Sequence, residues 1–206
     1  MKFKKILVLS LLYLFFSSCA SGYKNIDPSK FNYISNDKNE KVTFSYKYDI
    51  LNKKYSKKEA KNDIKLIAVK VTNSSENELT IGDNLALIYG DGNELTLLEN
   101  KEIFQSLKQS PASYLWYLLL TPMQFNTTST NSNGYTEQTS SLPIGVIIGP
   151  GIAGGNILTA SSANKKFKQD LLEFNLLGKK IKQGETVYGL LGIRSKNYNS
   201  IYIKLK

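Results

Sequence analysis

The inventory of residue types decides which chemistry this chain can perform. The chain contains a single cysteine, Cys19, and no histidine. Histidine is the commonest general base in enzymes and the commonest metal ligand in proteins. The thiol of Cys19 is therefore the side chain whose type and position most clearly indicate covalent chemistry.

Cys19 follows a segment with the pattern of an export signal. Met1–Lys5 is cationic, and Ile6–Phe16 is almost entirely apolar. As a helix, this run of roughly eleven residues covers about 16 Å, or about half of the hydrocarbon thickness of a bilayer. The pattern predicts a cleaved signal peptide over residues 1–18 and not a permanent membrane anchor.

The residues around the predicted cut, Phe16-Ser17-Ser18-Cys19, resemble the lipobox of bacterial lipoproteins. The resemblance implies cleavage between Ser18 and Cys19 and attachment of a diacylglycerol to the Cys19 thiol. Phe16 stands where that family usually has leucine, although an apolar residue is kept. A lipidated Cys19 leaves the mature chain without a thiol, which excludes disulfides and thiolate metal sites. The alternative is a soluble secreted protein with an incidental cysteine.

The residues after Cys19 bear on the destination of the protein. Ala20 and Ser21 follow the cysteine, without the aspartate that retains lipoproteins of this kind at the inner membrane. The resemblance therefore implies the outer membrane, with the protein facing the periplasm or the cell surface.

The net charge of +10 falls by three when the lysines of the signal peptide are removed. Such a balance suits contact with anionic lipid headgroups. Arg194 is the only arginine, and lysine is the weaker residue for planar recognition of phosphates or bases. We therefore expect a solvated cationic surface and no nucleic-acid partner.

A glycine-rich segment has the form of a nucleotide-binding motif. Gly149–Gly154 matches G-x-G-x-x-G and follows the strand-like Val146–Ile148. No βαβ repeat surrounds it, and Asp170 falls in an amphipathic helix instead of at the end of a second strand. We expect no dinucleotide and no other cofactor.

Two further matches to functional motifs are explained by chance. Ser162–Lys165 fits the S-x-x-K pattern of penicillin-binding enzymes, but the accompanying S-D-N and K-T-G motifs are absent. Asp91–Glu94 lacks the run of oxygen ligands of a calcium loop and is typical of a hairpin turn. A carboxylate-dependent enzyme acting on envelope polymers stays the alternative function, because paired acids meet only in three dimensions.

The mature chain begins with Cys19 and a polar stretch, 19–40, which predicts a flexible tether. Beyond it, residues with a period of two and short β-branched runs predict about seven strands. They lie at 42–50, 64–72, 79–81, 85–89, 95–98, 186–193 and 200–205. We expect 85–89 to pair with 95–98, and 186–193 with 200–205, as hairpins. The predicted class is mainly β.

Several strand sequences resemble the immunoglobulin-like sandwich of small bacterial lipoproteins. They are Val71-Thr72-Asn73, Leu79-Thr80-Ile81, Ile181–Thr186 and Gly189–Ile193. The resemblance covers residues 41–98 and 179–206 and implies an antiparallel β-sandwich within a single domain, 41–206. It implies no activity.

A helical, glycine-rich insertion interrupts the strands at about 99–177. Two helices are expected, at 99–109 and 164–177, with a polar mobile loop from Phe125 to Ser141. Between them lie two apolar stretches, Tyr114–Leu120 and Leu142–Ala163, which we expect to form a helical hairpin packed on one face of the sandwich. The alternative is contact with a membrane or a partner protein.

That alternative assigns the contact to particular residues. Trp116 and Tyr117 are suited to the headgroup level of a bilayer, and Leu118 next to them belongs to the same predicted contact. The glycines are spaced by four, Gly145 with Gly149 and Gly151 with Gly155, and permit close approach of two backbones. The residue pattern thus favours a lipid-anchored, non-enzymatic envelope protein that acts by binding or structural contact at the membrane surface. An envelope protein is a candidate partner, and the oligomeric state stays open.

Overall fold

The computed structural model divides into two compact units. The structure describes residues 19–33, 35–39, 41–130 and 136–206. The first of the two units, here called the hairpin unit, contains Gln109–Ala163 together with residues 19–22. The other, the sheet unit, contains Tyr23–Lys108 and Asn164–Lys206. The predicted signal peptide, including Ser18 of the predicted cleavage site, lies outside the described residues.

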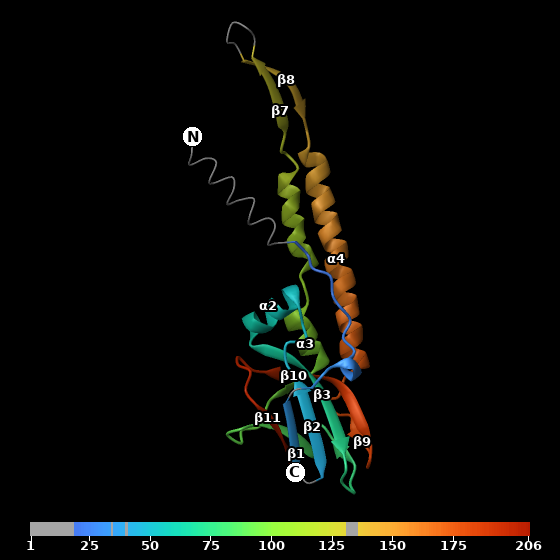
Figure 1. The fold of residues 1–206 in the computed structure, drawn as a ribbon. Helices are drawn as coiled ribbons and strands as arrows, with labels where there is room; N and C mark the ends of the chain where they lie inside the picture. The colour runs from blue at the N-terminus through green and yellow to red at the C-terminus, as the bar shows by residue number, and fades with distance from the viewer. Residues whose placement is uncertain (1–18, 34, 40, 131–135) are drawn as a thin grey trace. The chain divides into compact units, whose positions relative to one another are not determined.

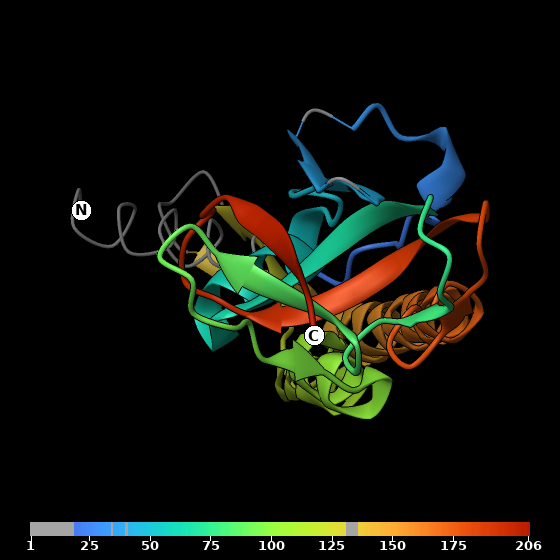
Figure 2. The same cartoon turned by 90° about the horizontal axis from the view of Figure 1, so that it is seen from below.

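The sheet unit is built around a five-stranded antiparallel sheet (Figures 1 and 2). In spatial order its strands are β1 (Ser35–Asn39), β2 (Val42–Lys47), β3 (Ile64–Asn73), β10 (Thr186–Arg194) and β6 (Leu97–Leu98). β3 and β10 pair along their whole length, from Thr72 opposite Thr186 to Ile64 opposite Arg194. β3 is buried on both faces for most of its length, as its apolar, β-branched sequence predicts.

Two smaller antiparallel sheets complete this unit. β5 (Leu85–Tyr89) pairs with β11 (Ile201–Leu205), and β4 (Leu79–Thr80) pairs with β9 (Lys180–Ile181). Side chains from all three sheets share one core. Phe44 and Val69 are fully buried in it, and Leu87, Ile181 and Ile203 are at most 5% exposed. The sheets therefore stabilise one another across a common apolar layer.

Three helical elements and the end of a fourth accompany the strands. They are η1 (Pro28–Lys30), α2 (Lys53–Asn62), α3 (Asn100–Leu107) and the last part of α4 (Gly145–Glu173), whose first part belongs to the hairpin unit. α3 packs closely on β10, because a Cβ at Gly192 would lie only 2.4 Å from the Ile103 side chain. The sequence predicted α3 but not α2, whose lysine-rich surface conceals the buried pair Tyr55 and Glu59.

The segment after Cys19 is bound to the sheet unit and is not a flexible tether throughout. Asp170 on α4 is 3% exposed and accepts hydrogen bonds from the Tyr23 hydroxyl at 2.8 Å and from the Ile26 N–H at 2.7 Å. The Tyr23 ring also packs edge-on against Tyr55 and contacts Phe167. The prediction of a tether over 19–40 is therefore wrong for Tyr23–Ile26, because a buried carboxylate on a distant helix supplies their hydrogen-bond acceptor.

The hairpin unit contains three elements besides the first part of α4. η2 (Pro111–Leu120) is a 3-10 helix, and β7 (Phe125–Thr130) pairs antiparallel with β8 (Thr136–Leu142) (Figure 1). The polar stretch predicted as a mobile loop therefore includes two paired antiparallel strands.

The antiparallel sheets of the prediction are confirmed, whereas the class is mixed: helices cover 35% and strands 30%. The strand positions were largely right, but one expected hairpin was wrong. β10 pairs with β3 and β6, and β11 pairs with β5. In the other expected hairpin, 85–89 with 95–98, the Leu95 N–H donates to the Leu87 carbonyl at 2.8 Å. Beyond Leu95 the chain leaves β5, and β6 pairs with β10. Local sequence does not reveal when a strand crosses from one sheet to another.

Candidate functional site

The two helical elements of the hairpin unit lie antiparallel and in close contact. A Cβ added at Gly145 would lie 2.2 Å from the Leu120 carbonyl oxygen, and one at Gly149 would lie 3.1 Å from the Tyr117 carbonyl oxygen. Glycine at these two positions lets the start of α4 touch the end of η2. This contact brings η2 and α4 together as a pair.

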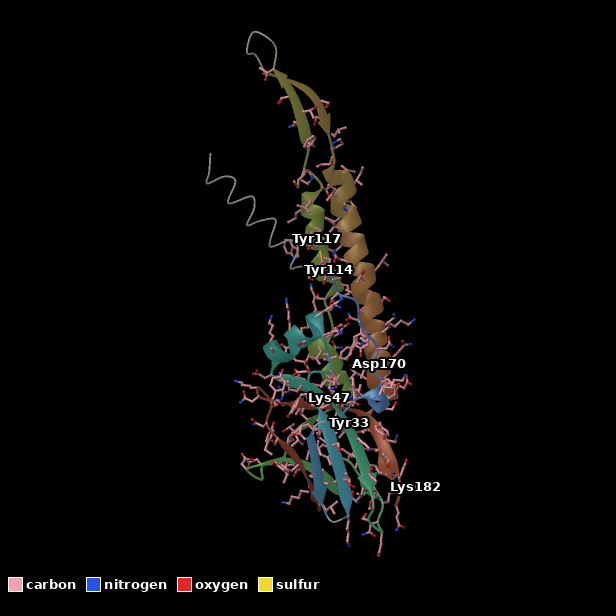
Figure 3. All side chains as sticks on the ribbon, in the orientation of Figure 1. Tyr33, Lys47, Tyr114, Tyr117, Asp170 and Lys182 are labelled. Atoms are coloured by element: carbon pink, nitrogen blue, oxygen red, sulfur yellow. The ribbon has the colours of Figure 1, made fainter. Side chains whose placement is uncertain are left out.

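A small aromatic and alanine core lies between η2 and α4. Tyr114 and Tyr117 stack with ring planes 5° apart, and both are nearly buried (Figure 3). Ala153 and Ala160 face them from α4 and are at most 3% exposed. Because η2 has three residues per turn, Tyr114, Tyr117 and Leu120 share its inner face. The intervening side chains must then point outward.

Together with the other exposed, large apolar residues of the hairpin unit, these outward side chains are here called the apolar surface. It consists of Leu115, Trp116, Leu118, Leu119, Met123, Phe125, Leu142, Val146, Ile147, Ile148 and Leu158. Trp116 is 73% exposed and Ile147 is 78% exposed. Scattered exposed apolar residues are ordinary, but a large group of them marks a surface that binds a membrane or another protein.

Charge is almost absent from this part of the chain. Glu137 is the only Asp, Glu, Lys or Arg between Gln109 and Ala163, although the chain holds 27 Lys plus Arg and 17 Asp plus Glu. In sequence, Lys108 lies just before this stretch, and Lys165 and Lys166 lie just after it. An uncharged segment flanked by lysines is typical of protein that enters the apolar part of a bilayer.

The residues next to Cys19 are fastened to the hairpin. The Ser21 N–H donates to Gln109 Oε1 at 3.0 Å, and Gln109 Nε2 donates to the Ser21 carbonyl at 2.6 Å. The Ala20 N–H donates to the side-chain oxygen of Asn156, near the middle of α4. Cys19 itself is exposed. The hairpin unit therefore places the predicted lipid attachment point beside Asn156.

The polar side chains on the first part of α4 bond to the backbone of their own helix. Asn156 Nδ2 donates to the Ile152 carbonyl at 2.8 Å, and Thr159 Oγ1 donates to the Gly155 carbonyl at 2.8 Å. Such back-bonding satisfies a polar group inside its helix and reduces its need for water. Asn156 and Thr159 are therefore less unfavourable in a membrane helix than two polar side chains without such bonds would be.

The residues predicted for membrane or partner contact divide into two groups. Trp116 and Leu118 are exposed, and the Gly151 and Gly155 positions open onto free space. Tyr117, Gly145 and Gly149 instead face inward and hold η2 against α4. The sequence did not identify Gln109 or Asn156 as contacts of the residues after Cys19, because local sequence does not reveal a hydrogen-bond partner that is distant along the chain.

α4 is long and apolar enough to cross a membrane by length and composition. Only 22% of its most apolar stretch is buried within the protein. A helix of similar length and hydropathy in the core of a soluble protein is mostly buried, whereas α4 is not.

The sheet unit offers less for binding or catalysis. An open pocket of about 340 Å³ is lined by Asn100, Lys101, Phe104, Gln105, Lys168, Leu171 and Leu172, with no carboxylate among them. Glu59 is 3% exposed and accepts the Leu66 N–H at 2.8 Å. Burial raises its pKa to about 7. Among the described residues, no three acidic or cysteine side chains gather closely enough to hold a metal ion.

Comparison with known proteins adds no relative. The sequence matches no protein-family model, and neither the curated proteins nor the solved structures contain a match to the chain.

Proposed function

We propose that this chain is a lipid-anchored, non-enzymatic protein of the bacterial cell envelope. It binds its membrane at two places, the acyl chains on Cys19 and the apolar surface of the hairpin unit. The sheet unit, an immunoglobulin-like sandwich in this proposal, extends into the aqueous space and is available for contact with an envelope protein. The outer membrane is the proposed location, because Ala20 and Ser21 replace the inner-membrane retention signal.

The observation that carries the proposal is the apolar surface itself. Its most exposed members include Ile147, at 78% exposed, and Trp116, at 73% exposed, within a stretch that holds a single charge. Moving one fully exposed side chain of this size out of water contributes about 1.5–3 kcal/mol. A surface of this kind is costly in water and favourable in a bilayer.

The position of Cys19 supports the same function. Gln109 and Asn156 hold the residues after Cys19 against η2 and α4. A lipid on Cys19 would therefore emerge beside the apolar surface. Both attachments then act on one membrane.

The alternative of a carboxylate-dependent enzyme needs two acids that face one cleft. The open pocket of the sheet unit has lysine and not carboxylate in its lining. The buried carboxylates of Glu59 and Asp170 accept backbone hydrogen bonds from Leu66 and Ile26. A role in stability accounts for both acids.

The lipid attachment is tested by intact-mass measurement of the full chain extracted from producing bacterial cells. The expected product begins at Cys19 and carries the added mass of a thioether-linked diacylglycerol. Cys19→Ser should lose this mass and leave the membrane fraction, whereas Gly22→Ala, a site with no neighbour within 4 Å, should retain both. An unacylated wild-type product would contradict the proposal.

A further inference from the structure

The apolar surface covers more than one side of α4 near its start. Val146, Ile147 and Ile148 are consecutive, and their exposed fractions are 55%, 78% and 43%. Successive residues of an α-helix point about 100° apart, so these three together span about 200° of the helix circumference. Gly145 and Gly149, on the remaining side, contact η2. A helix that lies flat on a membrane needs only one apolar side, so exposure over more than half of the circumference fits immersion in the hydrocarbon.

Polar segments bound the apolar surface at both ends. Beyond Phe125 and Leu142, the strands β7 and β8 consist mainly of Thr, Ser, Asn and Gln. At the other end lie Asn156, which holds Ala20, and the exposed Ser161. The hairpin unit therefore has an apolar middle between two polar ends.

The length of that middle matches the apolar layer of an outer membrane. From Asn156 to Gly145 the helix rises about 16 Å, at 1.5 Å per residue. The three residues from Gly145 back to the Phe125–Leu142 pair add up to about 10 Å, since an extended residue covers at most about 3.3 Å. The total, at most about 26 Å, agrees with the apolar band of about 25 Å on outer-membrane barrels.

Where η2 ends and α4 begins, the backbone hydrogen bonds are made within the hairpin unit, as a segment in hydrocarbon requires. The Thr121 N–H donates to the Leu118 carbonyl, the Met123 N–H to the Leu120 carbonyl and the Gly145 N–H to the Met123 carbonyl, at 2.9 to 3.0 Å. By contrast, the outer edges of a two-stranded hairpin carry unpaired groups. β7 and β8 must therefore lie where water or headgroups can reach them.

We propose that the hairpin unit crosses the membrane that holds Cys19, with β7 and β8 emerging on the face opposite to the lipid anchor. η2 and the first part of α4 occupy the hydrocarbon as an antiparallel pair. Asn156 lies at the near headgroups, beside the acylated Cys19, and the Phe125–Leu142 pair lies at the far headgroups. This inference rests on the proposed function, because it names the bilayer as the occupant of the apolar surface and sets the depth of insertion.

Single-thiol labelling tests the crossing in the full, lipidated chain. Acylation removes the thiol of Cys19, so an introduced cysteine is the only thiol of the mature protein. Thr128→Cys reports on the exposed tip of β7, and Asn32→Cys reports on an exposed site of the sheet unit. Thr130→Cys, at the end of β7, is a second variant, used if Thr128→Cys does not reach the membrane fraction. A membrane-impermeant maleimide is applied to intact cells, then to cells with a permeabilised outer membrane, and then to lysed cells.

The crossing predicts that the tip and sheet-unit thiols become reactive at different steps. At the step that admits the maleimide to only one side, one thiol is labelled severalfold more than the other. Equal labelling of both at every step places them on the same side and overturns the crossing, while an acylated mass at Cys19 would still leave the proposed function standing. Absence of the acyl mass overturns the proposed function and the crossing together.

Discussion

The carboxylate of Asp170 accepts a hydrogen bond from the Ile26 N–H at 2.7 Å, across a sequence separation of 144 residues. Asp170 also accepts from the Tyr23 hydroxyl, whose pKa is raised by burial and by the nearby Asp170 charge. One acidic side chain thus fixes the segment that leads from Cys19 into the sheet unit.

Replacing Asp170 by Asn is expected to lower the free energy of unfolding by about 2 kcal/mol, because hydrogen bonds to a charged group contribute about 1.5–3 kcal/mol. In asparagine an NH₂ group replaces one carboxylate oxygen, so a donor takes the place of an acceptor beside groups that are themselves donors. Denaturant unfolding of the full chain in detergent measures the change. Glu173→Gln, an exposed acid three residues along α4, is the matched control and should change stability little. An unchanged midpoint for Asp170→Asn would contradict the role given to this carboxylate.

Truncation tests the same contact independently. A chain that starts at Lys41 lacks Ile26, which is 4% exposed, and the Tyr23 ring that packs on Phe167. Loss of a buried isoleucine alone costs about 2–5 kcal/mol, so this chain should unfold at a clearly lower denaturant concentration. A chain that starts at Ala20 keeps these contacts and those of Ala20 and Ser21, and should match the parent. Equal stability of the two truncated chains is the outcome that this account does not allow.

The buried carboxyl of Glu59 should make stability depend on pH. Burial raises its pKa from 4.5 to about 7, against the opposing effect of the Leu66 hydrogen bond. Between these two values the folded state binds more protons than the unfolded state. Glu59 therefore contributes stability that is fully present below about pH 4.5 and is lost as pH rises to about 7, on the order of 3 kcal/mol in total.

Glu59→Gln should remove this part of the pH dependence. The glutamine keeps an oxygen for the Leu66 N–H but carries no charge at any pH. Above pH 7 the variant is expected to be more stable than the parent, and the difference should shrink on acidification. Glu76→Gln, at an exposed position, provides the control for the loss of one carboxylate. Parallel stability curves for Glu59→Gln and the parent would contradict the raised pKa.

The glycines of α4 should differ in their tolerance of alanine. A Cβ at Gly145 would lie 2.2 Å from a backbone oxygen, whereas one at Gly151 meets nothing within 4 Å. Gly145→Ala should destabilise the hairpin unit by about 1–3 kcal/mol through overpacking. Gly151→Ala should raise stability by about 0.5–1 kcal/mol, because alanine favours the helix. Thermal unfolding of both variants in detergent measures the contrast, and similar shifts would show that η2 and α4 do not touch as described.

Much of the fold could be predicted from local sequence. The period-two pattern from Val42 and the apolar run from Ile64 identified β2 and β3, and Ile103 with Leu107 identified α3. β2 ended earlier than expected, at Lys47, and Asp49 nearby adopts a φ of 56°, outside the extended region. These successes share one cause, because burial leaves a pattern in the local sequence. The pattern is periodic for β2 and α3, and it is a continuous apolar run for β3, which is buried on both faces.

The long-range contacts could not be predicted, because no local pattern marks them. Asp170 looked like a surface acid on an amphipathic helix, yet it binds Ile26. Tyr117 was assigned to possible membrane or partner contact, yet it packs inside the hairpin unit with Tyr114. The exposure of Trp116 likewise depends on which residues of η2 face inward, and this follows from the 3-10 geometry that the sequence did not predict.

Membrane binding should depend on the apolar surface and not on apolar side chains in general. Ile147 and Leu172 are both exposed on α4, but only Ile147 belongs to the hairpin unit. Ile147→Asn should weaken partitioning of the unacylated chain onto vesicles about tenfold, since burying an isoleucine contributes about 1.5–3 kcal/mol and 1.4 kcal/mol is tenfold. Leu172→Asn should leave partitioning nearly unchanged. Flotation with vesicles of phosphatidylethanolamine and phosphatidylglycerol provides the measurement, and equal losses for the two variants would contradict this assignment.

Trp116 is the only tryptophan of the chain, so its fluorescence reports on the apolar surface without a label. The most direct measurement is its emission when the acylated protein is incorporated in vesicles that contain acyl-brominated lipid. Contact of the hairpin with the hydrocarbon predicts a shift of the emission to shorter wavelength and strong quenching by the bromines. Emission that stays at the wavelength of a water-exposed tryptophan, with no quenching, would contradict the central claim that this surface binds the membrane.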